Sequence, residues 1–389
     1  MSAATFPGRC LLQFIFDVNM TPAKNTQAQP ALLKGGLTET HLAGLDGLRA
    51  IAAFMVVFYH FGIPFVSGGA GVLMFFVLSG FLITWLLLRE NDDTGTVSLR
   101  QFYARRSLRI FPAFYCYVAV LFAVILIRQH ARVVWPQTFA ALFYVSNYYQ
   151  ALNGDPNTGL SHTWSLAIEE QFYLLWPVTF LLFRRDYKRM SQFLAGIIVV
   201  IWIYREALIF LFHVHQGYIY EAFDTRADHL LIGCLLAVTL RSGFFPRFWN
   251  WISVRSWAAL VVAALLATSS ALESTFGAVY RDSVASIANP LLVAVWITQL
   301  IALRGTPLWS WTSWKWVRYL GRISYSIYLY QQLLVDSAKN ALVHQRVEIQ
   351  LAATVALITL AASASYYFIE RPFLRLKTRF SRAASVTAP

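Results

Sequence analysis

Apolar runs of about 20 residues recur along this chain, and short stretches rich in charge, proline or glycine separate them. A helix of about 20 apolar residues crosses the ~30 Å hydrocarbon core of a bilayer. Lipid also requires each spanning segment to satisfy its own backbone hydrogen bonds. The pattern therefore predicts an all-α polytopic membrane protein with about ten transmembrane helices, near 44–63, 69–88, 109–128, 164–183, 192–212, 227–241, 255–272, 284–303, 319–337 and 349–369.

A further apolar run, 135–149, is short and ends in polar residues. If it crossed the membrane, the basic group at 184–189 would lie on the opposite side from that at 100–109. If it does not cross, one face of the membrane carries all five basic groups of the chain, at 100–109, 184–189, 241–255, 315–322 and 371–379. The positive-inside rule prefers this arrangement. We therefore predict a re-entrant or surface helix near 135–149, with the N- and C-termini both cytoplasmic.

Three regions follow from this pattern. Residues 1–40 mix polar residues with one short apolar patch and predict a poorly ordered cytoplasmic N-terminal extension. Residues 41–373 form the predicted membrane domain, and 374–389 a basic cytoplasmic tail. No periodic internal repeat or appended soluble domain is visible.

Composition supports this class. The chain is 58% hydrophobic and only 13% charged, which is unusual for a soluble protein of 389 residues. Its net charge of +13 could suggest nucleic-acid binding, but the basic residues lie just beyond apolar runs, so no nucleic-acid partner is predicted. The three cysteines, Cys10, Cys116 and Cys234, have no CxxC spacing, so neither a disulfide framework nor a metal site is indicated.

The first predicted span carries an unusual polar stripe. Arg49 and His60 are eleven residues apart, which in a helix is within ~20° of whole turns and ~16 Å along the axis. Arg49 could simply reach the interface or pair with Asp46, and His60 could be satisfied by a carbonyl or by water. Imidazole, however, can act as a base at neutral pH, which makes His60 a catalytic candidate.

The second span is rich in small residues at Gly68, Gly69, Gly71, Ser79 and Gly80. Such residues allow helices to approach closely in lipid. Close helix packing and passage of a substrate chain remain equal alternatives for them.

Three arginines, Arg105, Arg106 and Arg109, follow the second span. One or two of them can be explained by membrane orientation or by lipid head groups. Because guanidinium groups match phosphate bidentately, the cluster also predicts a phosphorylated ligand at the cytoplasmic face.

Adjacent carboxylates, Glu169 and Glu170, occur in the otherwise apolar segment 161–177, which also contains His162, Trp164 and Tyr173. Neighbours ~100° apart on a helix should not both face one partner. We expect one glutamate to face a cavity and the other a structural cation, without assigning which. For His162 a capping or interfacial role is favoured over catalysis.

Two further polar segments, 224–229 and 370–371, are expected to form local ion pairs.

Taken in order, these segments resemble the integral-membrane acyltransferase-3 family from about Leu45 to Pro372. The motifs that carry the resemblance are LDGLRAIAAFMVVFYH, GGAGVLMFFVLSGF, FYARRSLRIFP, HTWSLAIEEQFYLLWP, RADHLLIG, GRISYSIYLY and the closing IERPF. The final ERP or the GGxG alone would be weak, but the ordered set is highly specific.

The resemblance implies a membrane enzyme that moves an acyl group, often acetyl, from cytoplasmic acyl-CoA (acetyl-CoA) to a hydroxyl of a sugar, surface polysaccharide or lipid-linked acceptor. No permanently bound cofactor is expected. The family's arginine, ten residues, histidine motif corresponds to Arg49 and His60. Its arginine-rich and acidic motifs correspond to Arg105, Arg106 and Arg109 and to Glu169 and Glu170.

On this basis we expect a membrane O-acyltransferase in a bacterial inner membrane. His60, Glu169, Glu170 and Arg49 would be catalytic, with His60 acting either as a base or as a transient acyl carrier. Donor-binding residues would be Arg105, Arg106 and Arg109, and acceptor-side residues His162, Trp164 and Tyr173. The alternative is a proton-coupled transporter or flippase of an anionic or sugar-like solute, because intramembrane Arg, His and Glu are typical of carriers too.

Overall fold

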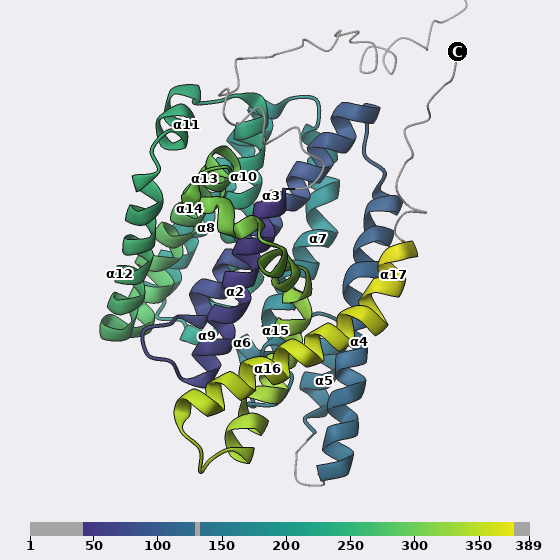
Figure 1. Ribbon diagram of the computed structural model, residues 1–389. Helices are drawn as coiled ribbons and strands as arrows, with labels where there is room; N and C mark the ends of the chain where they lie inside the picture. The colour runs from purple at the N-terminus through teal and green to yellow at the C-terminus, as the bar shows by residue number, and fades with distance from the viewer. Residues whose placement is uncertain (1–41, 129–132, 377–389) are drawn as a thin grey trace, which may run out of the picture.

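The computed structural model describes residues 42–128 and 133–376, and this part of the chain is helical without strands (Figure 1). The predicted N-terminal extension, and the basic tail beyond residue 376, lie outside the described residues. The helices are α2 (Ala43–Phe61), α3 (Gly68–Thr94), α4 (Leu99–Arg128), α5 (Trp135–Leu142), α6 (Ser146–Asn153), α7 (Thr163–Phe183), α8 (Tyr187–Phe210), α9 (Gln216–Glu221), α10 (Phe223–Ser242), α11 (Pro246–Ser253), α12 (Trp257–Tyr280), α13 (Ser286–Leu303), α14 (Pro307–Ser310), α15 (Lys315–Ala341), α16 (Val347–Ser365) and α17 (Arg371–Leu376), with π-helical turns η1 (Arg281–Ala285) and η3 (Tyr366–Glu370) and a 3₁₀ turn η2 (Trp311–Ser313).

Seven stretches of the described chain are long and apolar enough to cross a membrane, and a bent pair formed by α10 and α11 would be an eighth. The protein is thus a multi-pass membrane protein, while the predicted number of about ten spans is not confirmed. One of the seven, Trp257–Leu303, has 47 residues, and a straight helix of that length would be ~70 Å long. Gly277 has non-helical backbone angles inside it, so this stretch is not one straight crossing.

As predicted, the segment 135–149 does not form a continuous span. It contains α5 and the start of α6, two helices of eight residues each, and each is only ~12 Å long. Figure 1 places α6 and α9 at the end of the bundle where α2 ends.

Helix α4 begins earlier than predicted. Apolar length alone indicated a span from 109, whereas α4 begins at Leu99 and runs through Pro112. The arginine cluster therefore lies within α4. The spacing of its arginines along this helix decides which of them share a face.

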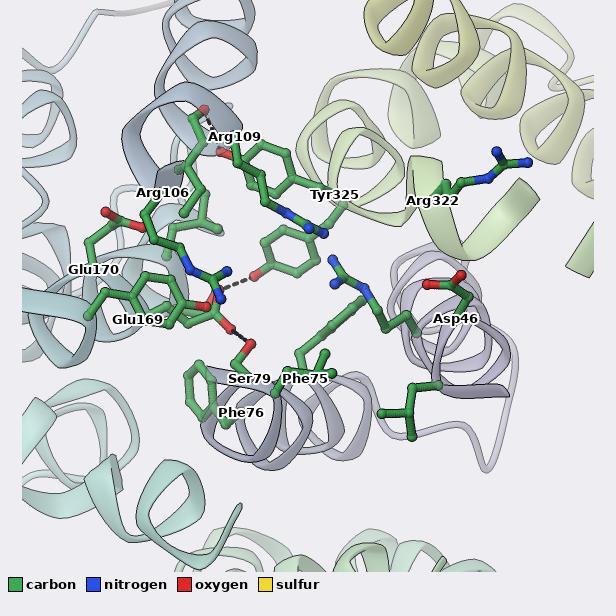
Figure 2. A pocket seen from close by; sticks show the side chains of 18 of the residues that line it. Asp46, Phe75, Phe76, Ser79, Arg106, Arg109, Glu169, Glu170, Arg322 and Tyr325 are labelled. Carbon is green, nitrogen blue, oxygen red and sulfur yellow. Dashed lines mark hydrogen bonds between the residues drawn. The ribbon is translucent and has the colours of Figure 1, made fainter. Parts of the chain in front are cut away.

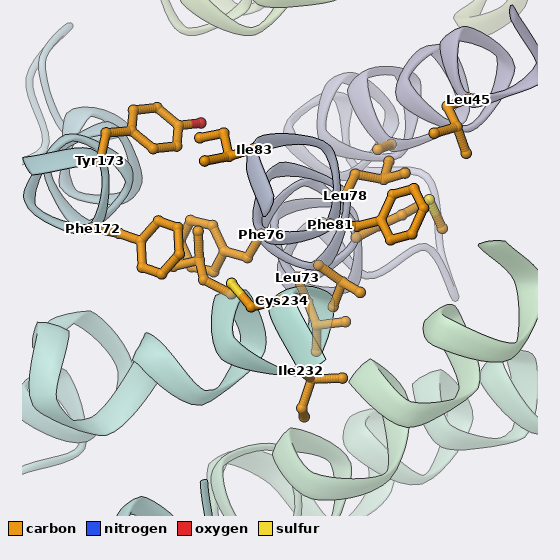
Figure 3. Close-up of a cluster of buried hydrophobic side chains, with 14 of the residues drawn as sticks. Leu45, Leu73, Phe76, Leu78, Phe81, Ile83, Phe172, Tyr173, Ile232 and Cys234 are labelled. Carbon is orange, nitrogen blue, oxygen red and sulfur yellow. The ribbon is translucent and has the colours of Figure 1, made fainter. Parts of the chain in front are cut away.

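Helices α2, α3 and α10 pack closely at the centre because glycines face backbone atoms of their neighbours. A Cβ at Gly80 of α3 would lie 1.9 Å from the Leu230 carbonyl oxygen of α10, and one at Gly233 would lie 2.1 Å from that of Val77. Gly71 faces the Ala52 carbonyl of α2 in the same way, at 2.7 Å. Around these contacts the buried side chains form an apolar cluster that includes Phe76 and Phe81 (Figure 3).

Helix α16 runs obliquely across the outside of the bundle and leads through η3 into α17, beside α4 (Figure 1). Most of its residues are not buried, whereas Glu370 at the end of η3 is buried. This oblique path brings the chain's last helices back to the arginines of α4.

Candidate active site

A cavity of ≈ 490 Å³ lies between α2, α3, α4, α7, α15 and the η3–α17 segment. We call it the arginine cavity, because guanidinium groups from three different helices line it. Its ionisable lining residues are Asp46, Arg49, Arg106, Arg109, Glu169, Glu170, Arg322 and Glu370. A polar cavity of this size inside an apolar bundle is the expected form of a small-molecule site.

Two of the three clustered arginines line the cavity. Arg106 and Arg109 are one turn apart on α4 and point into the same space (Figure 2). Arg105 is not among the lining residues, and its guanidinium lies 2.8 Å from the Glu90 carboxylate. Adjacent helical residues differ in direction by ~100°, and on α4 this rotation carries Arg105 away from the cavity that Arg106 and Arg109 line.

Arg49 reaches the same cavity from α2. Its Nε donates a long hydrogen bond of 3.4 Å to Ser324 of α15. Within the described residues, no carboxylate lies within 4.0 Å of the guanidinium of Arg49, Arg106 or Arg109. Buried charges are normally paired, so these cations require water or an anionic ligand in the cavity.

Both adjacent glutamates line the cavity, so the expectation that only one of them would do so is wrong. The lining residues of α7 include Ser165, Glu169, Glu170 and Tyr173, and therefore cover a face broad enough for two neighbours. The Ser79 hydroxyl donates to Glu169 Oε1 at 2.7 Å. In Figure 2 the Glu169 carboxylate lies beside Ser79, whereas Glu170 lies at the margin.

Tyr173 lines the arginine cavity, whereas His162 and Trp164 do not. The Arg106 guanidinium carbon lies 5.2 Å from the centre of its ring, which is a cation–π contact. Tyr173 is eleven residues, or ~16 Å of helix, beyond His162, and its assignment to the acceptor side remains a prediction.

Aromatic rings and hydroxyls in the cavity lining connect it to His162. Phe75 of α3 meets Tyr328 of α15 edge to face, with ring centres 6.2 Å apart. The Tyr328 hydroxyl lies 2.5 Å from that of Ser165 and donates to the His162 carbonyl at 3.0 Å. Phe75, Ser165 and Tyr328 line the cavity, while His162 does not.

His60 also does not line the arginine cavity. Its Nδ1 lies 2.9 Å from the Val56 carbonyl oxygen, which can only accept a hydrogen bond. Nδ1 therefore carries a proton, and Nε2 of the neutral ring keeps its lone pair. This is the tautomer that a general base requires.

His162 is placed just before α7, but its side chain makes no capping bond, so the favoured capping role is wrong. Its ring is buried between those of Tyr117 and Tyr328, and within the described chain neither ring nitrogen has a hydrogen-bond partner. Burial, and to a smaller extent the charge of His60, lower the pKa of His162 to about 3, so the ring is neutral at physiological pH.

Trp164 lies outside the arginine cavity as well. Its ring packs against Tyr220 of α9 at 5.0 Å and against Phe76 of α3 at 6.3 Å. His60, His162 and Trp164 therefore remain predictions for the acceptor side, and none of them lines the arginine cavity.

The glycines of α3 contact neighbouring helices. Gly80 and Gly71 face backbone carbonyls, Gly68 faces the Tyr59 ring, and Gly69 faces the Tyr220 hydroxyl. Of the five small residues singled out in this helix, Ser79 alone lines the arginine cavity. The geometry therefore favours packing for the four glycines.

Sequence reasoning missed Glu370 as a site residue. It was expected to form a local ion pair with Arg371, but no such pair is present among the described residues, and Glu370 lines the cavity instead. The Ser326 hydroxyl donates to its Oε1 at 2.6 Å. The π-helical turn η3 places Glu370 inside, and π-turns are frequent at functional sites. The available signal was a carboxylate at the end of an apolar run.

Fold and site together define a class: a helical multi-pass membrane protein with an arginine-lined internal cavity. Residues 42–369 match the acyltransferase domain of the acyltransferase-3 family, and the chain belongs to that family.

Two curated proteins show the relationship. The chain is 32% identical to "O-acetyltransferase OatA" of Staphylococcus aureus (strain NCTC 8325 / PS 47) over 357 residues, which cover 85% of this chain and 57% of that protein. It is 31% identical to "Putative peptidoglycan O-acetyltransferase YrhL" of Bacillus subtilis (strain 168) over 356 residues, or 85% of this chain and 55% of that protein. The chain thus matches little more than half the length of these relatives. No solved structure matches it significantly.

Proposed function

We propose that this protein is a membrane O-acyltransferase that moves an acyl group, acetyl in the simplest case, from cytoplasmic acyl-CoA to a hydroxyl of a surface glycan. The observation that carries the proposal is the convergence of Arg49, Arg106 and Arg109 on one internal cavity without carboxylate partners among the described residues. Arginine forks match phosphate bidentately, and coenzyme A carries phosphates. Membership of the acyltransferase-3 family and the names of the relatives support the reaction type.

The topology that suits this reaction has ten crossings with both termini in the cytoplasm of a bacterial inner membrane. Dividing Trp257–Leu303 at Gly277 and adding α10 and α15 to the remaining spans produces that number. The beginning of α2, with Arg49, then faces the cytoplasm, and its end, with His60, faces outward. The donor would enter on the arginine side and the acceptor on the histidine side.

In the proposed reaction the acceptor oxygen attacks the thioester carbonyl carbon. A carbon–oxygen bond forms, the carbon–sulfur bond breaks, and the acceptor proton passes to His60 Nε2, while the coenzyme leaves as a thiolate that is then protonated. Transient acylation of His60 is the variant of this scheme in which the imidazole attacks first. The carboxylates of Glu169 and Glu370 would accept and donate protons within the cavity.

In this scheme the acyl group passes from the arginine cavity to the histidines, neither of which lines that cavity. Arg49 and His60 are ~16 Å apart along α2, so they would contact opposite ends of the bound donor rather than each other. An extended pantetheine arm would cover part of that distance.

The decisive experiment measures acetyl transfer from labelled acetyl-CoA to a soluble glycan acceptor by the purified, reconstituted protein. Loss of a general base lowers the rate by about 10²–10⁴-fold, which we expect for His60→Ala. His213→Ala, an exposed histidine outside the cavity, serves as the matched control. Wild-type rates in the His60 variant would contradict its catalytic role. Glycan uptake without any acyl donor would instead favour a carrier.

A further inference from the structure

A second cavity, of ≈ 390 Å³, lies on a face of α7 that is ~100° around the helix from the arginine cavity. It is lined by residues from α7, α8 and α10, and we call it the α7–α8 groove. Several of its lining side chains are largely exposed on the surface of the protein, including Leu175 at 54% and Val200 at 63%. In a membrane protein such side chains face the lipid, so the groove opens to the bilayer.

The walls of the groove offer no unsatisfied polar group along its length. Trp176 donates its Nε1 proton to Thr84 on α3 at 2.9 Å, so only its apolar ring is presented to the groove. The Thr179 hydroxyl donates to the Leu175 carbonyl at 3.1 Å. The remaining walls are aliphatic and aromatic, which suits a hydrocarbon chain rather than a polar ligand.

The length of the groove matches one leaflet. Its lining residues on α8 extend from Phe193 to Tyr204, eleven residues or ~16 Å of helix. The hydrocarbon core of a bilayer is ~30 Å thick, so the groove is about as long as one lipid chain is deep.

The end of the groove near α6 and α9 is polar and acidic. Asp224, the first acidic residue of α10, lines it. Tyr148 of α6 donates to Asp224 Oδ1 at 2.9 Å, and Tyr218 of α9 donates to Oδ2 at 3.0 Å. Burial and this carboxylate raise the pKa of Tyr148 to about 12, so its hydroxyl remains a donor.

This acidic end has a preferred ligand chemistry. A carboxylate has about four acceptor sites, and the hydroxyls of Tyr148, Tyr218 and Tyr204 use three of them. No lysine or arginine lines the groove, so a purely anionic head group finds no cation there. An ammonium group can donate hydrogen bonds to the acceptor capacity that remains on the Asp224 carboxylate.

We propose that the α7–α8 groove binds one hydrocarbon chain of a membrane lipid whose head group carries an ammonium, such as phosphatidylethanolamine, with that ammonium at Asp224. The bound chain packs against the face of α7 that carries Phe172, Leu175 and Trp176, next to the face that carries Glu169. It thereby supports the helix that presents both glutamates to the arginine cavity. This binding does not depend on the proposed acyl transfer.

The test exposes the delipidated protein in detergent to phosphatidylethanolamine or phosphatidylglycerol and counts retained lipids by native mass spectrometry. The wild type should retain one phosphatidylethanolamine that survives dilution. Ile197→Trp, which fills the groove, should lose it. Val200→Trp at the exposed rim is a second filling variant that leaves the interior unchanged, and Val199→Trp, on the same helix and outside the lining, is the matched control that should retain the lipid.

Asp224→Asn tests the head group separately. Exposed ion pairs are weak, so this variant should reduce the preference for phosphatidylethanolamine over phosphatidylglycerol by about two- to fivefold while still binding a chain. Equal retention by Val200→Trp and Val199→Trp, or no retained lipid in the wild type, would overturn the groove as a binding site. An unchanged lipid preference in Asp224→Asn would overturn the assignment of the ammonium.

Discussion

Two groups of arginines in this protein differ in what they face. Arg205 of α8 is fully buried and lies 2.9 Å from the Asp228 carboxylate of α10, which also accepts from Trp202. Arg226 likewise pairs with Asp282, at 3.4 Å. Arg106 and Arg109 have no such partner among the described residues and face a cavity. The same residue type therefore joins helices in one region and is available to a ligand in the other.

This difference has an energetic basis. Removing one member of a buried ion pair leaves an uncompensated charge, whereas removing an arginine that faces a cavity leaves only a larger cavity. The paired group should thus affect folding, and the cavity group should affect donor binding.

The largest effect should come from breaking the paired group. Asp228→Ala leaves Arg205 unpaired and should destabilise the fold by about 3–5 kcal/mol, measured as the unfolding free energy in mixed micelles. The double variant Arg205→Met with Asp228→Leu removes both charges and should recover most of that loss. If the single variant is as stable as the wild type, the pair does not join α8 to α10.

An intermediate effect is expected from the cavity group. Hydrogen bonds to charged groups contribute about 1.5–3 kcal/mol, so Arg106→Gln should weaken coenzyme A binding by about 10- to 150-fold. Binding of labelled coenzyme A to the reconstituted protein measures this. Thermal stability should remain near wild type, which is the contrast with Asp228→Ala.

The matched control is Arg185→Gln, which removes an exposed arginine outside the cavity lining. It reports the effect of lowering the net charge alone. Equal weakening by both variants would mean that Arg106 acts through general charge rather than through contact.

The smallest effect should come from Ser79→Ala. Ser79 donates the only hydrogen bond to Glu169 described in this part of the chain, and a typical hydrogen bond contributes about 0.5–1.5 kcal/mol. We expect a stability loss in that range together with a changed pH–rate profile, because Glu169 loses a partner. If stability falls as far as in Asp228→Ala, Glu169 belongs with the structural carboxylates and the comparison fails.

The sequence predicted much of the site because its residues lie at helical spacing. Arg49, Arg106, Arg109, Glu169 and Glu170 were all named and all line one cavity. Arg105 is directed to Glu90, because its direction on α4 differs by ~100° from that of Arg106. Glu370 was missed, since its inward direction depends on a π-turn that no local pattern announced.

The sequence by itself determined the class of this protein, since long apolar runs in a chain poor in charge can be satisfied only as helices in lipid. It also determined which residue types carry chemistry. Only the tertiary structure decided which arginines are paired, because their carboxylate partners Asp228, Asp282 and Glu90 each lie on a different helical element from the arginine. It also decided that the arginines line a cavity that His60 does not line. Pairing and separation depend on how helices pack in three dimensions, and a pattern along one helix does not contain that information.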